Sequence, residues 1–338
     1  MTTSKQPAVL ILGANGRLGL CLAQAFHEAG WRVIAQLRRS PDPRLPAAVQ
    51  VTQADIANSV QLARDGAGAS MVVHAINPSY TRWATELLPM ANAAMDVVQR
   101  LNARLWLPGN VYNFGASMPP LLRQDTPQTA VTRKGALRIR LEAELERRAT
   151  DGALAVSIVR AGDFFGAGTG NWFDQAIVKS LRAGKLVYPG PLDVPHAWAY
   201  LPDLARAFVA LAERPAPNCG AFERFHFAGH TLTGDQLLQA IQQAATTLGV
   251  ERSNGWTRGT MPWSVIRLGG LIVPMWRELA EMAYLWRVPH ALDGTTLERA
   301  VGRLSQTALP DAVHDTLRGL GFGAPSTGTH TPALAARH

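Results

Sequence analysis

A glycine-rich turn near the amino terminus constrains the fold more than any other stretch of the chain. The run Gly13-Ala14-Asn15-Gly16-Arg17-Leu18-Gly19 follows the apolar segment 8–12 and opens a helical pattern that stops at Gly30. Glycine permits a tight turn and lets a diphosphate approach the backbone, and the start of the next helix offers unpaired amide groups and a positive dipole end. Because a further apolar segment, 33–37, completes the strand–turn–helix–strand order, the sequence predicts a dinucleotide-binding site.

The first half of the chain alternates between strand and helix patterns. We expect strands at 8–12, 32–37, 49–52, 71–75, 104–108 and 155–160, and helices at 17–29, 57–65, 83–101 and 135–150. Such alternation predicts an α/β fold of the Rossmann type, a doubly wound parallel sheet that binds ligands at the carboxyl ends of its strands.

The alternation breaks down beyond residue 165, where we expect a smaller, mostly helical C-terminal substrate subdomain. The predicted domains are an NAD(P)-binding domain at 1–165, a mixed region at 166–322 and a disordered tail at 323–338. The mixed region is expected to hold the remaining sheet elements and a lid over the substrate.

The end of the second predicted strand indicates which dinucleotide binds. An NAD site usually has Asp or Glu here, whose carboxylate accepts hydrogen bonds from the ribose 2′-hydroxyl. No acid lies between Glu28 and Asp42, whereas Arg38 and Arg39 suit a 2′-phosphate, and Arg17 is expected to reinforce that charge. The pattern favours NADP over NAD, and the alternative is a solvated basic strand end.

Composition excludes several classes of protein. The chain has 338 residues, of which 47% are hydrophobic and 17% charged, as expected of a globular protein with a sizeable core. The net charge of +8 comes from scattered arginines with no basic tract, so we expect no nucleic-acid partner. The longest apolar stretch, 261–276, contains Arg267 and two prolines and is too short to span a bilayer, so no membrane partner is expected.

Cysteine and histidine spacing predicts neither disulfides nor a metal site. Cys21 and Cys219 form no disulfide framework, and the segment 1–7 lacks the layout of a secretion signal, so a cytoplasmic location is the simplest expectation. His226 and His230 fit a strand pattern and have no third ligand, so no metal is expected.

The set of motifs resembles the extended short-chain dehydrogenase/reductases, the NAD-dependent epimerase/dehydratase family, over roughly residues 8–250. The resemblance rests on Gly13-x-x-Gly16-x-x-Gly19, Asp55, the segments 73–78, 110–115 and 159–166, and Tyr200-x-x-Asp203-Leu204-Ala205. It implies that Asp55 and Ile56 flank the adenine. It also implies that Ala75, Ile76 and Asn77 line the ribose and diphosphate, and that 160–163, Ala161 included, lies near the nicotinamide.

The chain departs from this family at the catalytic positions. The family's chemistry normally uses a tyrosine as acid/base, a lysine four residues later and a Ser or Thr that holds the substrate oxygen. This chain has no Tyr-x-x-x-Lys. In the family's register Lys134 replaces the tyrosine, Arg138 replaces the lysine and Asn110 replaces the Ser or Thr.

Three residues are therefore candidates for a changed catalytic set. Repulsion from Arg138 would lower the pKa of Lys134 and make it a neutral base; alternatively, Lys134 binds the cofactor ribose. Asn110 is expected to donate a hydrogen bond to a carbonyl oxygen, and Tyr112 either supplies a phenol or packs as a loop aromatic.

Two further pairs of residues have open roles. Tyr80 and Trp83 form a substrate wall or cap the sheet. His196 and Tyr200 reach the substrate or serve a buried structural role.

Three functions remain open at this point. The first is an NADP-dependent oxidoreductase that moves a hydride to or from a small carbonyl or hydroxyl compound with a non-standard acid/base set. The second is a non-catalytic NADP(H)-sensing regulator similar to NmrA-like proteins, and the third is a sugar-nucleotide epimerase or dehydratase, which needs the missing tyrosine. The family commonly dimerises through two long helices, so a homodimer through 83–101 and 135–150 is a further expectation.

Overall fold

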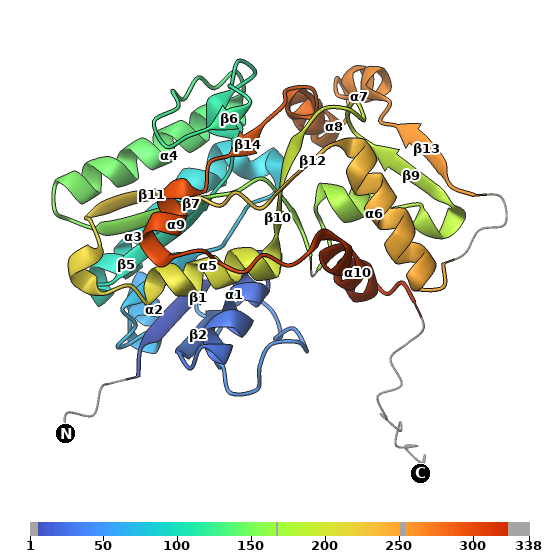
Figure 1. Cartoon of the computed structure of the whole chain (residues 1–338). Coiled ribbons are helices and arrows are strands. Elements are labelled where there is room, and N and C mark those ends of the chain that lie inside the picture. The colour runs from blue at the N-terminus through green and yellow to red at the C-terminus, as the bar shows by residue number, and fades with distance from the viewer. Residues whose placement is uncertain (1–5, 167, 251–254, 324–338) are drawn as a thin grey trace, which may run out of the picture.

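A parallel sheet of seven strands forms the centre of the computed structural model, which describes residues 6–166, 168–250 and 255–323 (Figure 1). The strand order is β11-β7-β5-β4-β1-β2-β3. The strands are β1 (Ala8–Leu12), β2 (Arg32–Gln36), β3 (Gln50–Thr52), β4 (Met71–His74), β5 (Arg104–Gly109), β7 (Ala155–Arg160) and β11 (Phe222–His226). All adjacent pairs run parallel, which confirms the predicted Rossmann-type sheet.

Helices cover both faces of the sheet because its strands are apolar on both sides. Leu10 and Leu12 pack with α2 (Ser59–Asp65), α3 (Trp83–Leu101) and α4 (Arg133–Thr150). Val9 and Ile11 point the other way and pack with α1 (Arg17–Glu28), α5 (Leu201–Ala212) and α9 (Thr295–Val301). Side chains alternate between faces along a strand, so β1 contributes to two separate cores.

The chain reverses its direction of travel across the sheet between β1 and β4. Strands β2 and β3 lie on one side of β1, and β4, β5, β7 and β11 lie on the other. The loops that follow β1 and β4 therefore lie at the topological switch point of the carboxyl edge, which is where such sheets bind ligands.

The C-terminal part is helical, as expected, and also contains small sheets that the sequence did not predict within 256–320. Its helices include α6 (Gly234–Thr247), α7 (Trp263–Gly269), α8 (Pro274–Glu281) and α10 (Leu309–Gly319). The unpredicted strands are β13 (Thr257–Thr260), paired with β9 (Lys185–Tyr188), and β14 (Ala291–Leu292), paired with β6 (Leu121–Leu122). They are two to four residues long, too short to show an alternating pattern.

A third core joins these elements to the edge of the large sheet. A three-stranded sheet of β8 (Asp163–Phe165), β10 (His196–Tyr200) and β12 (His230–Leu232) contributes Phe165 and Trp198, which pack with residues of α6 and α10. Strand β11 returns from this half of the chain to the large sheet, so the boundaries proposed at 165 and 322 remain predictions. Apart from Gly323, the predicted disordered tail lies outside the described residues.

Candidate functional site

The glycine turn packs against the loop that follows β4. Gly13 has φ +83°, and a Cβ there would lie 2.9 Å from Cγ1 of Ile76. A Cβ at Gly19 would press on the Gly13 carbonyl oxygen and lie 2.9 Å from Cα of Ala14. The turn therefore needs glycine at both positions. The loops that follow β1 and β4 are in contact with each other.

Helix α1 begins directly at this turn. Its N-cap is Gly16, and within the described residues no side chain caps the first amide groups. Gly16 and Asn15 are exposed, so the first amides of α1 lie near the surface. An uncapped helix start behind a glycine cradle fits the diphosphate of a nicotinamide dinucleotide.

Side-chain amides fix the loops around the turn. The Gly13 N–H donates to Oε1 of Gln36 at 3.0 Å, and Nε2 of Gln36 donates to the Ala54 carbonyl at 3.0 Å. Nδ2 of Asn15 donates to the Ser40 carbonyl at 2.8 Å, and Oδ1 of Asn15 accepts from the Asp42 N–H at 3.2 Å. Asn15 therefore shapes the loop that carries Arg38.

The loop after β2 exposes two arginines and neutralises its nearest acid. Arg38 and Arg39 are exposed at the end of the strand. Asp42 accepts hydrogen bonds from Nε and Nη2 of Arg44 at 2.9 and 2.8 Å, and this pairing lowers the pKa of Asp42. The Asp42 carboxylate is thus paired with Arg44.

Arg17 lies on a different side of the turn from the one expected. Its Nη1 donates to the Thr169 carbonyl at 3.1 Å, and a Cβ at Gly168 would lie 3.0 Å from its Cγ. Burial lowers the pKa of Arg17, against the opposing effect of Asp174. Arg17 therefore joins the glycine turn to the loop after β8, and this contact gives no support to the idea that it reinforces Arg38.

Two tyrosines meet at the carboxyl edge of β4 and β5. The hydroxyl groups of Tyr80, in η1 (Tyr80–Arg82), and Tyr112, in η2 (Tyr112–Phe114), lie 2.7 Å apart. Asn110 holds this turn because its Oδ1 accepts from the Tyr112 N–H at 3.0 Å. Trp83 packs against both rings, with centroids 5.6 Å from Tyr80 and 6.1 Å from Tyr112.

Both phenols are held in their neutral form. Burial raises the pKa of Tyr80 to about 12, although the hydrogen bond from Tyr112 opposes this. Burial also raises the pKa of Tyr112, as does the neighbouring Tyr80. Each neutral phenol keeps a proton that it can donate, although the raised pKa makes it a weak acid.

Lys134 is enclosed by carboxylates, and its role as a neutral base or as a ligand of the cofactor ribose remains a prediction. It is 1% exposed, and its ammonium group contacts Glu278 and lies 2.6 Å from Oε2 of Glu281, both on α8. The ammonium also lies 5.1 Å from the Tyr80 ring centroid. These contacts hold the Lys134 side chain against α8.

Arg138 has partners of its own. Its Nη1 donates to the Pro108 carbonyl at 3.3 Å, and its guanidinium lies 5.0 Å from the Trp83 ring centroid. Burial lowers the pKa of Arg138, while Glu142 opposes that shift. Arg138 therefore packs against the Trp83 ring and helps to fix its position.

Asp163 on β8 and His196 on β10 form a hydrogen-bonded pair. Nε2 of His196 lies 2.9 Å from Oδ2 of Asp163, and its ring stacks on Trp286 with centroids 4.4 Å apart and planes 5° apart. The negative charge of Asp163 adds to the burial that raises the pKa values of Tyr80 and Tyr112. Within the described residues, His196 Nδ1 has no hydrogen-bond partner although it is buried.

Sequence reasoning missed the two carboxylates on α8. Glu278 and Glu281 are three residues apart and so share a helix face, which was the available signal. Nothing in the sequence connects them with Lys134, which is 144 residues from Glu278. Only folding brings them together.

The remaining predicted cofactor residues lie after β3, β4 and β7. Oδ1 of Asp55 accepts from the Ala57 N–H at 2.8 Å, and Ile56 is half-buried against the core under α3. Ala75 donates its N–H to the Leu12 carbonyl at 3.0 Å and leads into Ile76 and Asn77. Ala161 is buried and donates to the Gly109 carbonyl at 3.3 Å. These residues all follow strands of one parallel sheet, so they share its carboxyl edge.

The model of one protein family matches most of the chain. It is described as the NAD dependent epimerase/dehydratase family, and it matches residues 9–221. The chain belongs to this family. The match confirms the resemblance deduced from the glycine turn and the motifs that follow the strands, and it identifies a family of NAD(P)-dependent enzymes.

Individual relatives agree with this membership. The chain is 29% identical over 226 residues to a 3-diazoavenalumate denitrifying reductase from Streptomyces, covering 62% of this chain and 74% of that protein. A putative epimerase from Burkholderia cenocepacia has a TM-score of 0.71 at 17% identity, with 94% of this chain and 98% of that chain covered. The L-threonine dehydrogenase from Clostridium difficile has the same TM-score and identity, with 94% and 99% covered. At such identities the two structures share the fold with this epimerase/dehydratase family member.

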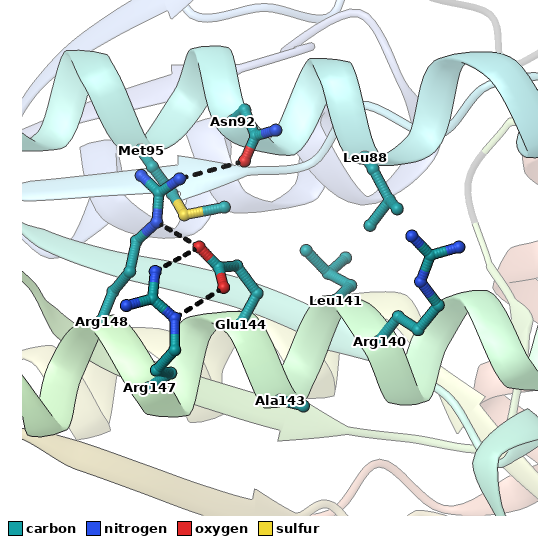
Figure 2. A pocket seen from close by; sticks show the side chains of 9 residues that line it. All are labelled: Leu88, Asn92, Met95, Arg140, Leu141, Ala143, Glu144, Arg147 and Arg148. Atoms are coloured by element: carbon teal, nitrogen blue, oxygen red, sulfur yellow. Dashed lines mark hydrogen bonds and ion pairs between the residues drawn. The ribbon is translucent and has the colours of Figure 1, made fainter.

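A surface groove between α3 and α4 lies apart from the candidate site (Figure 2). Nε of Arg148 donates to Oε1 of Glu144 at 2.7 Å, and Arg147 donates to both oxygens of Glu144, which lowers the pKa of Glu144 to about 2. The groove is lined by Leu88, Asn92, Met95, Arg140, Leu141, Ala143, Glu144, Arg147 and Arg148. It belongs to the two helices expected to form a homodimer, which remains a prediction.

The described residues contain neither a cluster of metal ligands nor a helix that could cross a membrane. No group of three or more His, Cys, Asp or Glu side chains there is placed to hold a metal ion. No described helix combines the length and apolar character needed to cross a bilayer.

Proposed function

We propose that this epimerase/dehydratase family member is an NADP-dependent reductase of a small carbonyl or related acceptor compound, with Tyr112 as its proton donor. The observation that carries the proposal is the Tyr80–Tyr112 hydrogen bond of 2.7 Å at the carboxyl edge. It puts a phenol at that edge, although the position of the family's usual tyrosine is occupied by Lys134.

The glycine turn and the loop after β2 support NADP as the cofactor. The uncapped start of α1 and the Gly13–Ile76 contact suit a diphosphate, and Arg38 and Arg39 suit a 2′-phosphate. NAD is the less favoured alternative. Bound NADPH supplies a hydride, so the protein itself has to supply a proton and stabilise developing negative charge.

Tyr112 is the residue that we assign to the proton. Its high pKa keeps the phenol protonated at neutral pH, and the Tyr80 hydroxyl is placed to donate a hydrogen bond to the oxygen that remains after transfer. The carboxamide nitrogen of Asn110 is assigned to the substrate oxygen.

A relative supports the reductive direction. The Streptomyces protein that is 29% identical is named a denitrifying reductase of 3-diazoavenalumate. A substrate panel therefore includes an arenediazonium salt beside aldehydes, ketones and enones.

The test is NADPH oxidation with this panel by the wild type and by Tyr112→Phe. We expect kcat for the best carbonyl substrate to fall about 100-fold or more in Tyr112→Phe with little change in NADPH affinity, because the alkoxide left by hydride transfer loses its proton donor. Tyr188→Phe, which alters a buried tyrosine of the third core, is the matched control and should keep activity. Equal rates in wild type and Tyr112→Phe would remove Tyr112 from the proposal.

A non-catalytic NADP(H)-sensing regulator is the alternative, favoured by one observation. Lys134 stands at the position of the family's acid/base residue. It is held by Glu278 and Glu281, so the acid/base role of that position does not carry over to it. If NADPH binds, no panel member oxidises it, and NADP and NADPH differ in affinity or in their effect on a protein partner, the sensor replaces the reductase. Conversion of a UDP-hexose would instead support a sugar-nucleotide epimerase or dehydratase.

A further inference from the structure

The helical hairpin formed by α7 and α8 exposes most of the large apolar surface of the described chain. Seven of the eleven exposed large hydrophobic side chains lie between residues 265 and 276. Ile272 is 86% exposed, Leu271 83% and Leu268 72%. Isolated exposed apolar residues are ordinary, but a cluster of this kind marks a binding surface.

The hairpin tip is positively charged. Residues 261–277 contain Arg267 and Arg277 and no acid. Arg267 is exposed, and the Arg277 side chain is 60% exposed, with Nε 3.6 Å from Oε1 of Glu278. The acids that follow point inward, because Glu278 and Glu281 are bound to Lys134 and Arg133. Glu278 therefore offsets part of the charge of Arg277, and Arg267 is the exposed cation nearest the end of the hairpin.

These inward ion pairs also give the hairpin a firm base. Arg133 donates from Nη2 to Oε1 of Glu278 at 2.9 Å, and the Lys134 ammonium lies between Glu278 and Glu281. Helix α8 is thereby attached to the start of α4, and α7 lies at the outer edge of the molecule (Figure 1). The apolar tip is a projection and not a groove.

We propose that the hairpin 263–277 docks on an anionic lipid surface. Leu268, Leu271 and Ile272 would enter the headgroup boundary, and Arg267 and Arg277 would pair with lipid phosphates, as in helices that lie in the plane of a membrane interface. A second copy of this chain fits less well, because an isologous contact would bring the two copies of Arg267 together and the segment 261–277 carries no acid to pair with them. The sequence predicted no membrane partner because the stretch cannot span a bilayer, but surface docking needs no span.

The test is vesicle flotation of the full-length protein. We expect it to float with vesicles that contain phosphatidylglycerol and to stay unbound with pure phosphatidylcholine. Leu271→Ser with Ile272→Ser should lower the partition coefficient at least tenfold. Arg267→Gln with Arg277→Gln should lower it about fivefold for each arginine and flatten its dependence on salt.

Matched controls distinguish binding by the hairpin from non-specific adsorption to vesicles. Val60→Ser and Val131→Ser alter exposed apolar side chains outside the hairpin, at 43% and 60% exposure, and should leave flotation unchanged. Circular dichroism confirms that each variant is folded. The proposal would be overturned if the protein did not float, or if flotation survived the hairpin changes. It would also be overturned if Leu271→Ser with Ile272→Ser abolished self-association while no lipid binding was seen. That last result would identify a second copy as the occupant.

Discussion

At the scale of single residues, the site is built from charges and phenols that find their partners far along the chain. Lys134 contacts Glu278 and Glu281, and Tyr80 contacts Tyr112. Lys134, Glu278 and Tyr112 are buried, so removing the partner of any of them leaves a buried polar group without compensation.

The Lys134 cluster gives a stability prediction. Lys134→Met should lower the free energy of unfolding by about 2–3 kcal/mol, because Glu278 is 6% exposed and keeps only the exposed side chains of Arg133 and Arg277 as nearby cations among the described residues. Urea denaturation measures this, and Lys185→Met, at an exposed lysine of β9, is the control. Adding Glu278→Gln to Lys134→Met should recover part of the loss. An unchanged urea midpoint in Lys134→Met would show that the cluster adds no stability.

At the scale of elements, the unit of β1, the glycine turn and α1 joins fold to function. Leu10 and Ile11 anchor the strand in two cores, while the turn at its end packs on Ile76. Small changes in the turn should therefore alter binding before they alter the whole fold.

Gly19→Ala tests this unit. The added methyl group would meet the Gly13 carbonyl and Ala14 Cα, so the turn has to move, and we expect NADPH affinity to fall more than tenfold. Gly319→Ala is the control, because nothing lies within 4 Å of its added methyl group; alanine there should stabilise helix α10 by up to about 1 kcal/mol. Equal NADPH affinity in both variants would mean that the turn does not seat the dinucleotide.

The sequence predicted these elements well where periodicity or glycine chemistry was strong. Helix α3 has the predicted bounds, 83–101, and α4 begins two residues before the predicted 135. The short strands β13 and β14 escaped prediction because they carry no alternating pattern. The pairing of Lys134 with Glu278 escaped because local sequence carries no information about contacts between segments 144 residues apart.

At the scale of the whole molecule, buried histidines link stability to pH. Burial, aided by Arg138, lowers the pKa of His74 to about 4, and burial, aided by Arg160, lowers that of His226 to about 4. Between pH 6.5 and about 4 the unfolded chain therefore binds protons at these positions that the folded chain does not. Stability should fall as the pH is lowered through this window.

The expected size is up to about 2 kcal/mol per histidine between pH 6.5 and pH 5. Urea denaturation at pH 7 and pH 5 measures it, and His226→Gln should show a smaller difference between the two pH values than the wild type. A wild type with the same stability at both pH values would contradict the assignment of neutral buried histidines.

The central claim is that the glycine turn seats a nicotinamide dinucleotide and that Arg38 selects its phosphorylated form. Isothermal titration calorimetry of the wild type and Arg38→Gln with NADPH and NADH tests it most directly. We predict that the wild type binds NADPH at least tenfold more tightly than NADH, and that Arg38→Gln loses this difference with little change in NADH affinity. Tighter binding of NADH would contradict the role of Arg38, and no heat with either nucleotide would contradict the claim as a whole.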